Sequence, residues 1–306
     1  PMPDTSLLPA ESMDCPAPLA WRDVVTSWRE ESEPFETDGC HGPVRGRTLG
    51  RGPALYFANP LLGRCELFAL LAWLLRDEFR CVLFDDSTLQ NPRTPRLRGS
   101  VVDMVDDLLA VAAFHQDSRF SVVGSGLGSV VGLSARSRTP DRVQALILQG
   151  LGLAGRLSRP ERWLSWLGSR LPGRLAQVPG FRSLLVHNHH PWFPPLDPSR
   201  LAFAIDTIGR LPLRVAARRA LRFDRLDLGP CLDKIQEQAP SSGDILLVVP
   251  ESHENTLATS ASRLSRSWPE LQVEPLAGCG RLSCLTHPHR LATLIRTFLT
   301  ETPPET

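Results

Sequence analysis

A glycine-rich turn at residues 120–129 is the segment whose residue types and spacing best suit chemistry. It reads FSVVGSGLGS, so an apolar strand is expected to enter the turn and a helix to leave it. The first N–H groups of a helix have no partner within the helix, and together with the helix dipole they attract negative charge. The turn is therefore expected to hold an anion or an oxyanion.

One hypothesis for this turn is a dinucleotide site. Gly124, Gly126 and Ser129 approximate the pattern G-x-G-x-x-G/A, in which glycines let the backbone approach a pyrophosphate. That pattern should follow the first strand of its unit, and an acidic residue should end the next strand. Here at least two strands come earlier, and the next strand ends in Gln149 without an acid. The sequence therefore disfavours dinucleotide binding.

Short apolar strands alternate with helices on both sides of this turn. Nearly continuous apolar strands are typical of a parallel sheet that is covered on both faces, so we expect an α/β fold. The expected strands are 54–58, 81–84, 120–123, 143–149, 244–249 and 271–275, and the expected helices are 66–75, 100–114, 130–136 and 292–300.

Two segments depart from this alternation. Residues 17–31 carry one apolar stripe and predict an amphipathic helix, which we group with the preceding arm as an N-terminal unit at 1–34. Residues 153–228 are rich in Arg, Trp and Leu, are broken by prolines and contain no convincing strand. We expect this segment to be a helical cap inserted between two halves of the core, residues 35–152 and 229–306.

The order and spacing of these pieces resemble the α/β-hydrolase superfamily over roughly residues 35 to 300. The resemblance implies a mostly parallel sheet with helices on both faces, an inserted helical cap and a nucleophile elbow of pattern G-x-S-x-G. The segments that carry it are 52–57, the oxyanion-loop position at 59–63, the strand ending at Phe84-Asp85, the elbow at 124–128, the strand 245–249, and the loops 278–283 and 286–288.

The resemblance places the three catalytic positions on Gly126, His253 and Arg281. Gly126 has no hydroxyl, His253 stands where the family has an acid, and Arg281, which stays protonated, stands where the family has its histidine base. Ser125 and Ser129 are out of register with the elbow pattern. We therefore predict a degenerate triad and no ordinary serine-hydrolase activity, because losing one triad member lowers the rate by orders of magnitude.

A ligand pocket is still expected between the elbow, the oxyanion loop and the cap. Gly126 frees space beside the first helical N–H groups, and Arg281 would add a permanent positive charge, so a small anionic ligand is expected. The alternative is that Arg281 pairs with Glu251 or Glu254. The candidate ligand-binding residues are Asn59, Leu61, Ser125, Gly126, Leu127, His190, Trp192 and Arg281.

Two classes of function follow from this pocket. The sequence favours a non-catalytic homologue that binds a small ligand or a protein partner. The second class is an enzyme that reuses the pocket without an acyl-enzyme, as a lyase, cyclase or isomerase would. Residual esterase activity is the weaker expectation, together with dinucleotide binding.

Three cap histidines, His187, His189 and His190, raise the question of a metal site. Zinc needs further ligands folded alongside, and the sequence identifies none, so we expect a polar, aromatic loop over the pocket and neither a metal nor a cofactor. The cap also carries a basic stripe that is expected to face solvent: Arg214, Arg218, Arg219 and Arg222.

Charge and cysteine content bear on the partners that the protein binds and on its location in the cell. The chain has 34 basic and 33 acidic side chains, and a net charge of +1 offers no electrostatic basis for nucleic-acid binding. The seven cysteines are scattered, which predicts reduced thiols and a cytoplasmic location. The longest uncharged run, 120–135, is too short for a membrane span. Arginine so outnumbers lysine that we expect a GC-rich, bacterial-like source.

Overall fold

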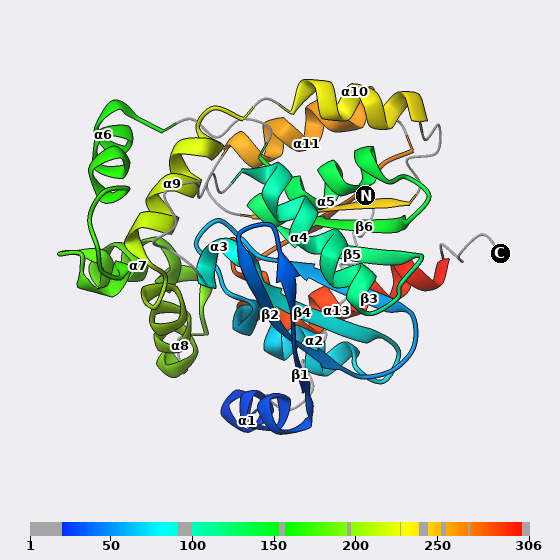
Figure 1. Cartoon of the computed structure of the whole chain (residues 1–306), viewed down its shortest axis with the longest axis horizontal. Helices are drawn as coiled ribbons and strands as arrows, with labels where there is room; N and C mark the ends of the chain where they lie inside the picture. Colours follow the sequence, from blue (N-terminus) through cyan, green and yellow to red (C-terminus); the bar gives the residue numbers. More distant parts are fainter. Residues whose placement is uncertain are drawn as a thin grey trace, which may run out of the picture.

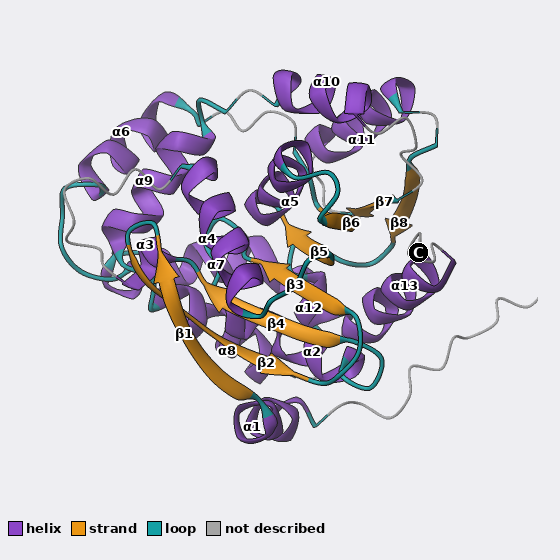
Figure 2. Cartoon of the chain, turned by 45° about the vertical axis from the view of Figure 1, so that its right-hand side comes forward, coloured by secondary structure: helices purple, strands orange, loops and turns teal. Residues whose placement is uncertain are grey.

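One eight-stranded sheet organises the protein (Figure 1). The computed structural model describes residues 20–90, 100–152, 157–194, 197–226, 228–238, 244–251, 255–268 and 270–301. The strand order is β1-β2-β4-β3-β5-β6-β7-β8, and helices lie on both faces of the sheet (Figure 2). The expected α/β fold class is confirmed.

Six parallel strands form the centre and one side of this sheet. Except for β8 at the edge, each is a short apolar run, as expected for strands that are buried on both faces. Because β3, β5 and β6 are neighbours, their carboxyl ends meet at one edge, where β5 leads into the glycine-rich turn. The strands are β3 (Ala54–Ala58), β4 (Arg80–Asp85), β5 (Phe120–Ser125), β6 (Val143–Gln149), β7 (Ile245–Pro250) and β8 (Gln272–Leu276).

An antiparallel hairpin, which sequence analysis missed, completes the other edge. It comprises β1 (Glu33–Gly39) and β2 (Gly42–Leu49), and β2 pairs antiparallel with β4. In β2 the buried side chains are those of Val44 and Leu49, and no side chain of β1 is fully buried. A polar, arginine-rich edge carries no apolar run, so its sequence did not signal strands.

The helices divide between the two faces according to the alternation of side chains along the strands. In β3, Leu55 and Phe57 point into one core, and Tyr56 points into the other. The first core is covered by α1 (Trp21–Glu31), η1 (Cys65–Phe68), α2 (Ala69–Leu75), α12 (Ser283–Thr286) and α13 (Pro288–Glu301). The second is covered by α4 (Val101–Phe114), α5 (Leu127–Arg138), α10 (Gly229–Gln238) and α11 (Asn255–Ser267).

A run of helices, here called the insertion, follows β6 and precedes β7 along the chain (Figure 1). As expected it is helical, and α8 packs Leu201 and Ile205 into the same core as α2. The domain boundaries expected from the sequence stay predictions. The insertion comprises α6 (Arg159–Gly168), η2 (Leu175–Gln177), α7 (Phe181–His189), η3 (His190–Trp192), α8 (Pro198–Gly209) and α9 (Leu213–Phe223). No helix in the described part of the chain is long and apolar enough to cross a bilayer.

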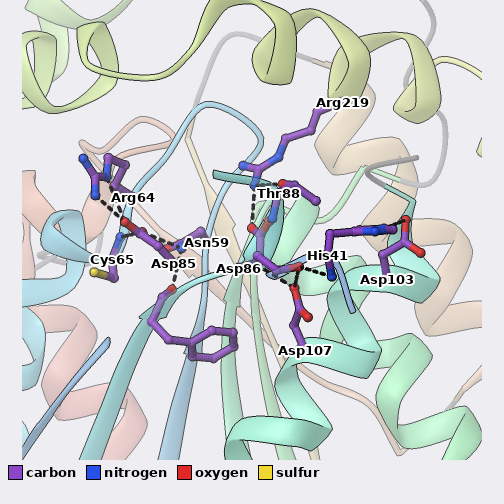
Figure 3. A network of polar contacts seen from close by, with 12 residues as sticks. His41, Asn59, Arg64, Cys65, Asp85, Asp86, Thr88, Asp103, Asp107 and Arg219 are labelled. Carbon is purple, nitrogen blue, oxygen red and sulfur yellow. Dashed lines mark hydrogen bonds and ion pairs between the residues drawn. The ribbon is translucent and has the colours of Figure 1, made fainter. Parts of the chain in front are cut away.

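One arginine of the expected basic stripe is buried instead of facing solvent. The side chain of Arg219 on α9 is 1% exposed, and its Nη2 donates to Asp86 Oδ2 at 2.5 Å and to Thr88 Oγ1 at 3.0 Å (Figure 3). Asp86 directly follows β4, and Thr88 lies on the short helix α3 (Ser87–Gln90). An ion pair therefore fixes the insertion to the end of a central strand.

We predict that Arg219→Ala lowers the free energy of unfolding by about 3–5 kcal/mol, because it leaves the Asp86 carboxylate buried without its cation. Arg222→Ala, on the same helix but exposed, is the matched control and should change stability by less than about 0.5 kcal/mol. Urea denaturation of both variants measures the difference. Equal effects would contradict a structural role for the buried pair.

Candidate functional site

The apex of the turn between β5 and α5 is Gly126. Its φ is +53°, a backbone conformation that residues with side chains rarely adopt. A Cβ built on Gly126 would meet no atom within 4 Å, so open space lies in front of the apex. Its backbone N–H donates to Gln149 O at 2.9 Å, which fixes the turn against the end of β6.

The glycines on either side of the apex permit very close backbone packing. A Cβ on Gly124 would lie 2.4 Å from Gly128 O, and a Cβ on Gly128 would lie 2.0 Å from Ala58 O. Side chains do not fit at such distances, so the first turn of α5 packs directly against the end of β3. The resulting geometry directs the first N–H groups of α5 towards the apex.

The two serines of the turn support its structure. Ser129 is fully buried, and its Oγ lies 2.9 Å from Gly124 O and 3.1 Å from Gln149 O, so its single proton is committed to backbone carbonyls. Ser125 is 4% exposed and is paired with Gln149 in the register of the sheet.

The loop after β3 is held by an aspartate at the end of β4. Asp85 accepts hydrogen bonds from Cys65 N and from Arg64 Nε, each at 2.8 Å, and its side chain is 3% exposed (Figure 3). Asn59 Nδ2 donates to Phe84 O at 2.8 Å. Leu61 is half-buried within this loop. The expected oxyanion loop is thus ordered beside the turn, and its role stays a prediction.

Two buried amide oxygens flank the turn, one from each strand beside β5. Gln149 Oε1 at the end of β6 and Asn59 Oδ1 directly after β3 are buried and accept no hydrogen bond from the described residues. The amide nitrogens of both side chains already donate hydrogen bonds. Asn59 Nδ2 donates to Phe84 O, as described above, and Gln149 Nε2 donates to Arg281 O at 2.8 Å. Buried acceptors of this kind call for a donor such as water or a ligand. Sequence analysis treated Gln149 as a missing acid and overlooked it as a polar end to a central strand.

Arg281 lies in the loop between β8 and α12, and its carbonyl receives the hydrogen bond from Gln149. The residue itself is exposed. Glu251, which the sequence offered as its partner, accepts a hydrogen bond from Gly278 N at 2.5 Å. His253, the expected acid position, and Glu254 lie outside the described residues.

The insertion meets this loop through the end of α7 and through η3. The ring of Trp192 packs so closely on Gly280 that a Cβ there would lie 2.7 Å from Trp192 Cδ1. His189 is half-buried; burial, and secondly the positive charge of Arg281, lower its pKa below the usual 6.5. It is therefore a neutral imidazole near pH 7, able to accept a proton. His190, another candidate, is exposed.

Comparisons with known proteins address the fold and, to a lesser extent, the activity. No family model matches the chain. A protein described as "Putative carbamate hydrolase RutD" from Agrobacterium fabrum is 28% identical over 109 residues, which span 35% of this chain and 42% of that relative. The match thus covers less than half of the relative's length.

Solved structures cover far more of the chain at lower sequence identity. A thermophilic esterase from Thermogutta terrifontis matches with a TM-score of 0.68 at 17% identity. The match spans 88% of this chain and 99% of the esterase chain. The enol-lactonase from Burkholderia xenovorans matches with a TM-score of 0.69 at 17% identity. The match spans 87% of this chain and 100% of the enol-lactonase chain. Likeness at this identity establishes the fold.

These comparisons contradict the expected non-catalytic homologue that binds a small ligand or a protein partner. The similar proteins are a carbamate hydrolase by description, an esterase and an enol-lactonase. They are not binding proteins, and none of these three is a lyase, a cyclase or an isomerase. The prediction inferred loss of catalysis from the residues at the three triad positions, whereas the proteins similar to this chain are described as hydrolytic enzymes.

We predict that Gly128→Ala destabilises the protein by about 3 kcal/mol or more, because its Cβ would clash with a backbone carbonyl that cannot rotate away. Gly132→Ala, one turn later on α5, is the matched control. Its Cβ would meet side-chain carbons at 3.4 Å, so alanine should be neutral or stabilising by up to ~1 kcal/mol. Thermal unfolding separates the two variants, and a stable Gly128→Ala protein would refute the close packing.

Proposed function

We propose, on the premise that this chain has the fold of the α/β-hydrolase superfamily, that it hydrolyses carbonyl compounds with water in place of a serine nucleophile. The observation that carries the proposal is Gly126 at the apex of the turn, with open space where a side chain would begin. The esters, lactones and carbamates named for similar proteins define the substrate class to test.

A degenerate triad is part of this proposal. Gly126 offers no hydroxyl for an acyl-enzyme, and the guanidinium of Arg281 does not accept protons. The hydroxyl of Ser129 is buried and bonded to backbone carbonyls, so it is not a substitute nucleophile. Hydrolysis then requires a water molecule to attack the substrate carbon directly.

The groups around the apex suit a water and a polarised carbonyl. Gln149 Oε1 and Asn59 Oδ1 lack donors among the described residues, and either one would orient an attacking water by accepting its hydrogen. The first N–H groups of α5, from Leu127 onwards, would bind the oxyanion that forms as water adds to the carbonyl. Such preorganised donors are the larger part of catalysis at many acyl-transfer sites.

The proton of the attacking water needs an acceptor, and we assign this role to His189. Its lowered pKa leaves the ring neutral, and the packing of Trp192 on Gly280 brings the end of α7 to the loop that holds Arg281. Water oxygen bonds to the carbonyl carbon while its proton passes to His189. The bond to the leaving group then breaks, and the leaving group takes a proton from the imidazolium.

Arg281 bears on the choice of substrate. After burial, its positive charge is the second cause that lowers the pKa of His189. A permanent cation beside the site favours substrates that carry a carboxylate or another anionic group, and it would oppose cationic ones. We therefore expect a half-ester of a dicarboxylic acid to be a better substrate than the corresponding neutral ester.

We predict that Gly126→Ala lowers kcat/KM for 4-nitrophenyl esters by about tenfold or more, because the added methyl fills the space assigned to water. Gly180→Ala is the matched control. Gly180 also has a positive φ, precedes a helix and would place its Cβ in open space, so it carries the same backbone strain. Equal losses in both variants, or no turnover by the parent, would refute the proposed nucleophile position.

A pH profile tests the assigned base. Because only neutral His189 accepts a proton, kcat/KM should rise with pH through a midpoint below 6.5 and stay flat above it. His189→Gln should remove this acid limb and lower the plateau, whereas His190→Gln, the exposed neighbour, should leave both unchanged. A midpoint above 6.5, or the same limb in His189→Gln, would rule out this base.

A further inference from the structure

A second polar cluster lies where the β1–β2 turn meets the start of α4 (Figure 3). Cys40 and His41 form the turn, and Asp103 and Asp107 lie one helical turn apart on the face of α4 that meets it. The ligand atoms of Cys40, His41 and Asp103 all lie within 4.8 Å of one another. Neither the sequence analysis nor the proposed hydrolysis uses these residues.

We propose that Cys40, His41 and Asp103 bind a divalent transition-metal ion, Zn²⁺ in particular, with water in the fourth position and Asp107 holding the turn that carries Cys40. One thiolate, one imidazole and one carboxylate form a mixed donor set that suits zinc. Calcium and magnesium prefer oxygen ligands throughout.

The distances between the ligand atoms fit a tetrahedral ion. His41 Nε2 lies 3.3 Å from Asp103 Oδ2, and the Cys40 thiol lies within 4.8 Å of the ligand atoms of both residues. With Zn–N and Zn–O bonds of about 2.0–2.2 Å, neighbouring nitrogen and oxygen ligands are about 3.3–3.5 Å apart. Small side-chain movements would therefore place an ion between these groups without a change of backbone.

The Nε2 atom of His41 faces the Asp103 carboxylate as an ion pair, an arrangement that a cation shared by the two groups would also hold. His41 Nε2 is buried, its side chain is 15% exposed, and within the described residues it makes no hydrogen bond of proper geometry, although a carboxylate oxygen lies 3.3 Å away. Such a nitrogen is commonly a metal ligand or hydrogen-bonded to water. Since the Asp103 carboxylate faces it, a shared cation accounts for both groups.

Hydrogen bonds from outside the cluster hold the ligands in place. Asp107 is fully buried and accepts from Cys40 N at 2.9 Å and, through its other oxygen, from Ser87 N and Ser87 Oγ at 2.8 and 2.7 Å. His41 N lies 3.2 Å from Ser87 Oγ, and Ser100 N donates to Asp103 at 2.9 Å. Outer groups of this kind orient metal ligands and raise affinity.

Metal binding would replace the proton of the Cys40 thiol. Without the ion, the thiol lies within hydrogen-bond distance of Asp107 and of the Asp103 carbonyl, each 3.1 Å away, and burial followed by Asp107 raises its pKa to about 12. The ion must therefore displace a firmly held proton, and one proton is released to solvent for each ion bound.

The test uses the whole protein, stripped of metal by a chelator and then titrated with Co²⁺ and Zn²⁺. We expect one equivalent of Co²⁺ to give the near-ultraviolet charge-transfer band of a thiolate ligand, and Zn²⁺ to abolish it by displacement. Cys40→Ser should lose the band, and Asp103→Asn should lower the affinity by about tenfold or more. Cys231→Ser, which alters a half-buried thiol elsewhere, is the matched control and should bind as the parent does.

Circular dichroism of the metal-free variants confirms that they are folded before titration. Asp103→Asn keeps an oxygen for the helix cap, so it remains informative if Cys40→Ser does not fold. The proposal is overturned if the parent binds no Co²⁺ with a thiolate band, if the band survives in Cys40→Ser, or if the affinity of Asp103→Asn equals that of the parent. Esterase assays do not enter this test, so its outcome is independent of the proposed hydrolysis.

Discussion

The direct contact between the start of α5 and the end of β3 is the constraint on which the site depends. A Cβ on Gly128 would lie 2.0 Å from Ala58 O, so the helix approaches the strand at backbone distance. This close approach goes with a sharp bend of the chain. At the bend, Gly126 has a positive φ and faces open space. The close approach at Gly124 and Gly128 does not involve a side chain at the apex, so the shape of the turn does not depend on a hydroxyl there.

The parallel register of the sheet gathers the polar groups around this apex. Because β3 and β6 flank β5, the residues that end them bring two amide oxygens to the same edge as the first N–H groups of α5. The hydrogen bond from Gln149 to Arg281 O then ties that edge to the loop before α12. Neutral acceptors beside a helix N-terminus form an environment in which a water and a carbonyl are both stabilised.

Sequence patterns predicted the parallel strands closely because all of them except the edge strand β8 are apolar runs buried on both faces. They failed where burial depends on a partner that is distant in the chain. Asp107 is a charged residue on a helix, yet it is fully buried because the turn at Cys40 folds over it from 67 positions away. Arg219 is buried because it pairs with Asp86, which directly follows β4. The polar β1–β2 hairpin and the orphan oxygen of Gln149 likewise carry no periodic signal.

If the proposed degenerate triad holds, Arg281 at the histidine position constrains the chemistry more than the missing serine does. A missing hydroxymethyl group frees about the volume of a water molecule, ~30 Å³ in the liquid, so the nucleophile has a ready substitute. Arginine, however, stays protonated and accepts no proton, so the base must come from another element. Burial, and secondly the charge of Arg281, lower the pKa of His189 and favour its neutral imidazole. Under the proposed mechanism the insertion, which packs on Gly280 through Trp192, would supply a base that the loop before α12 does not offer.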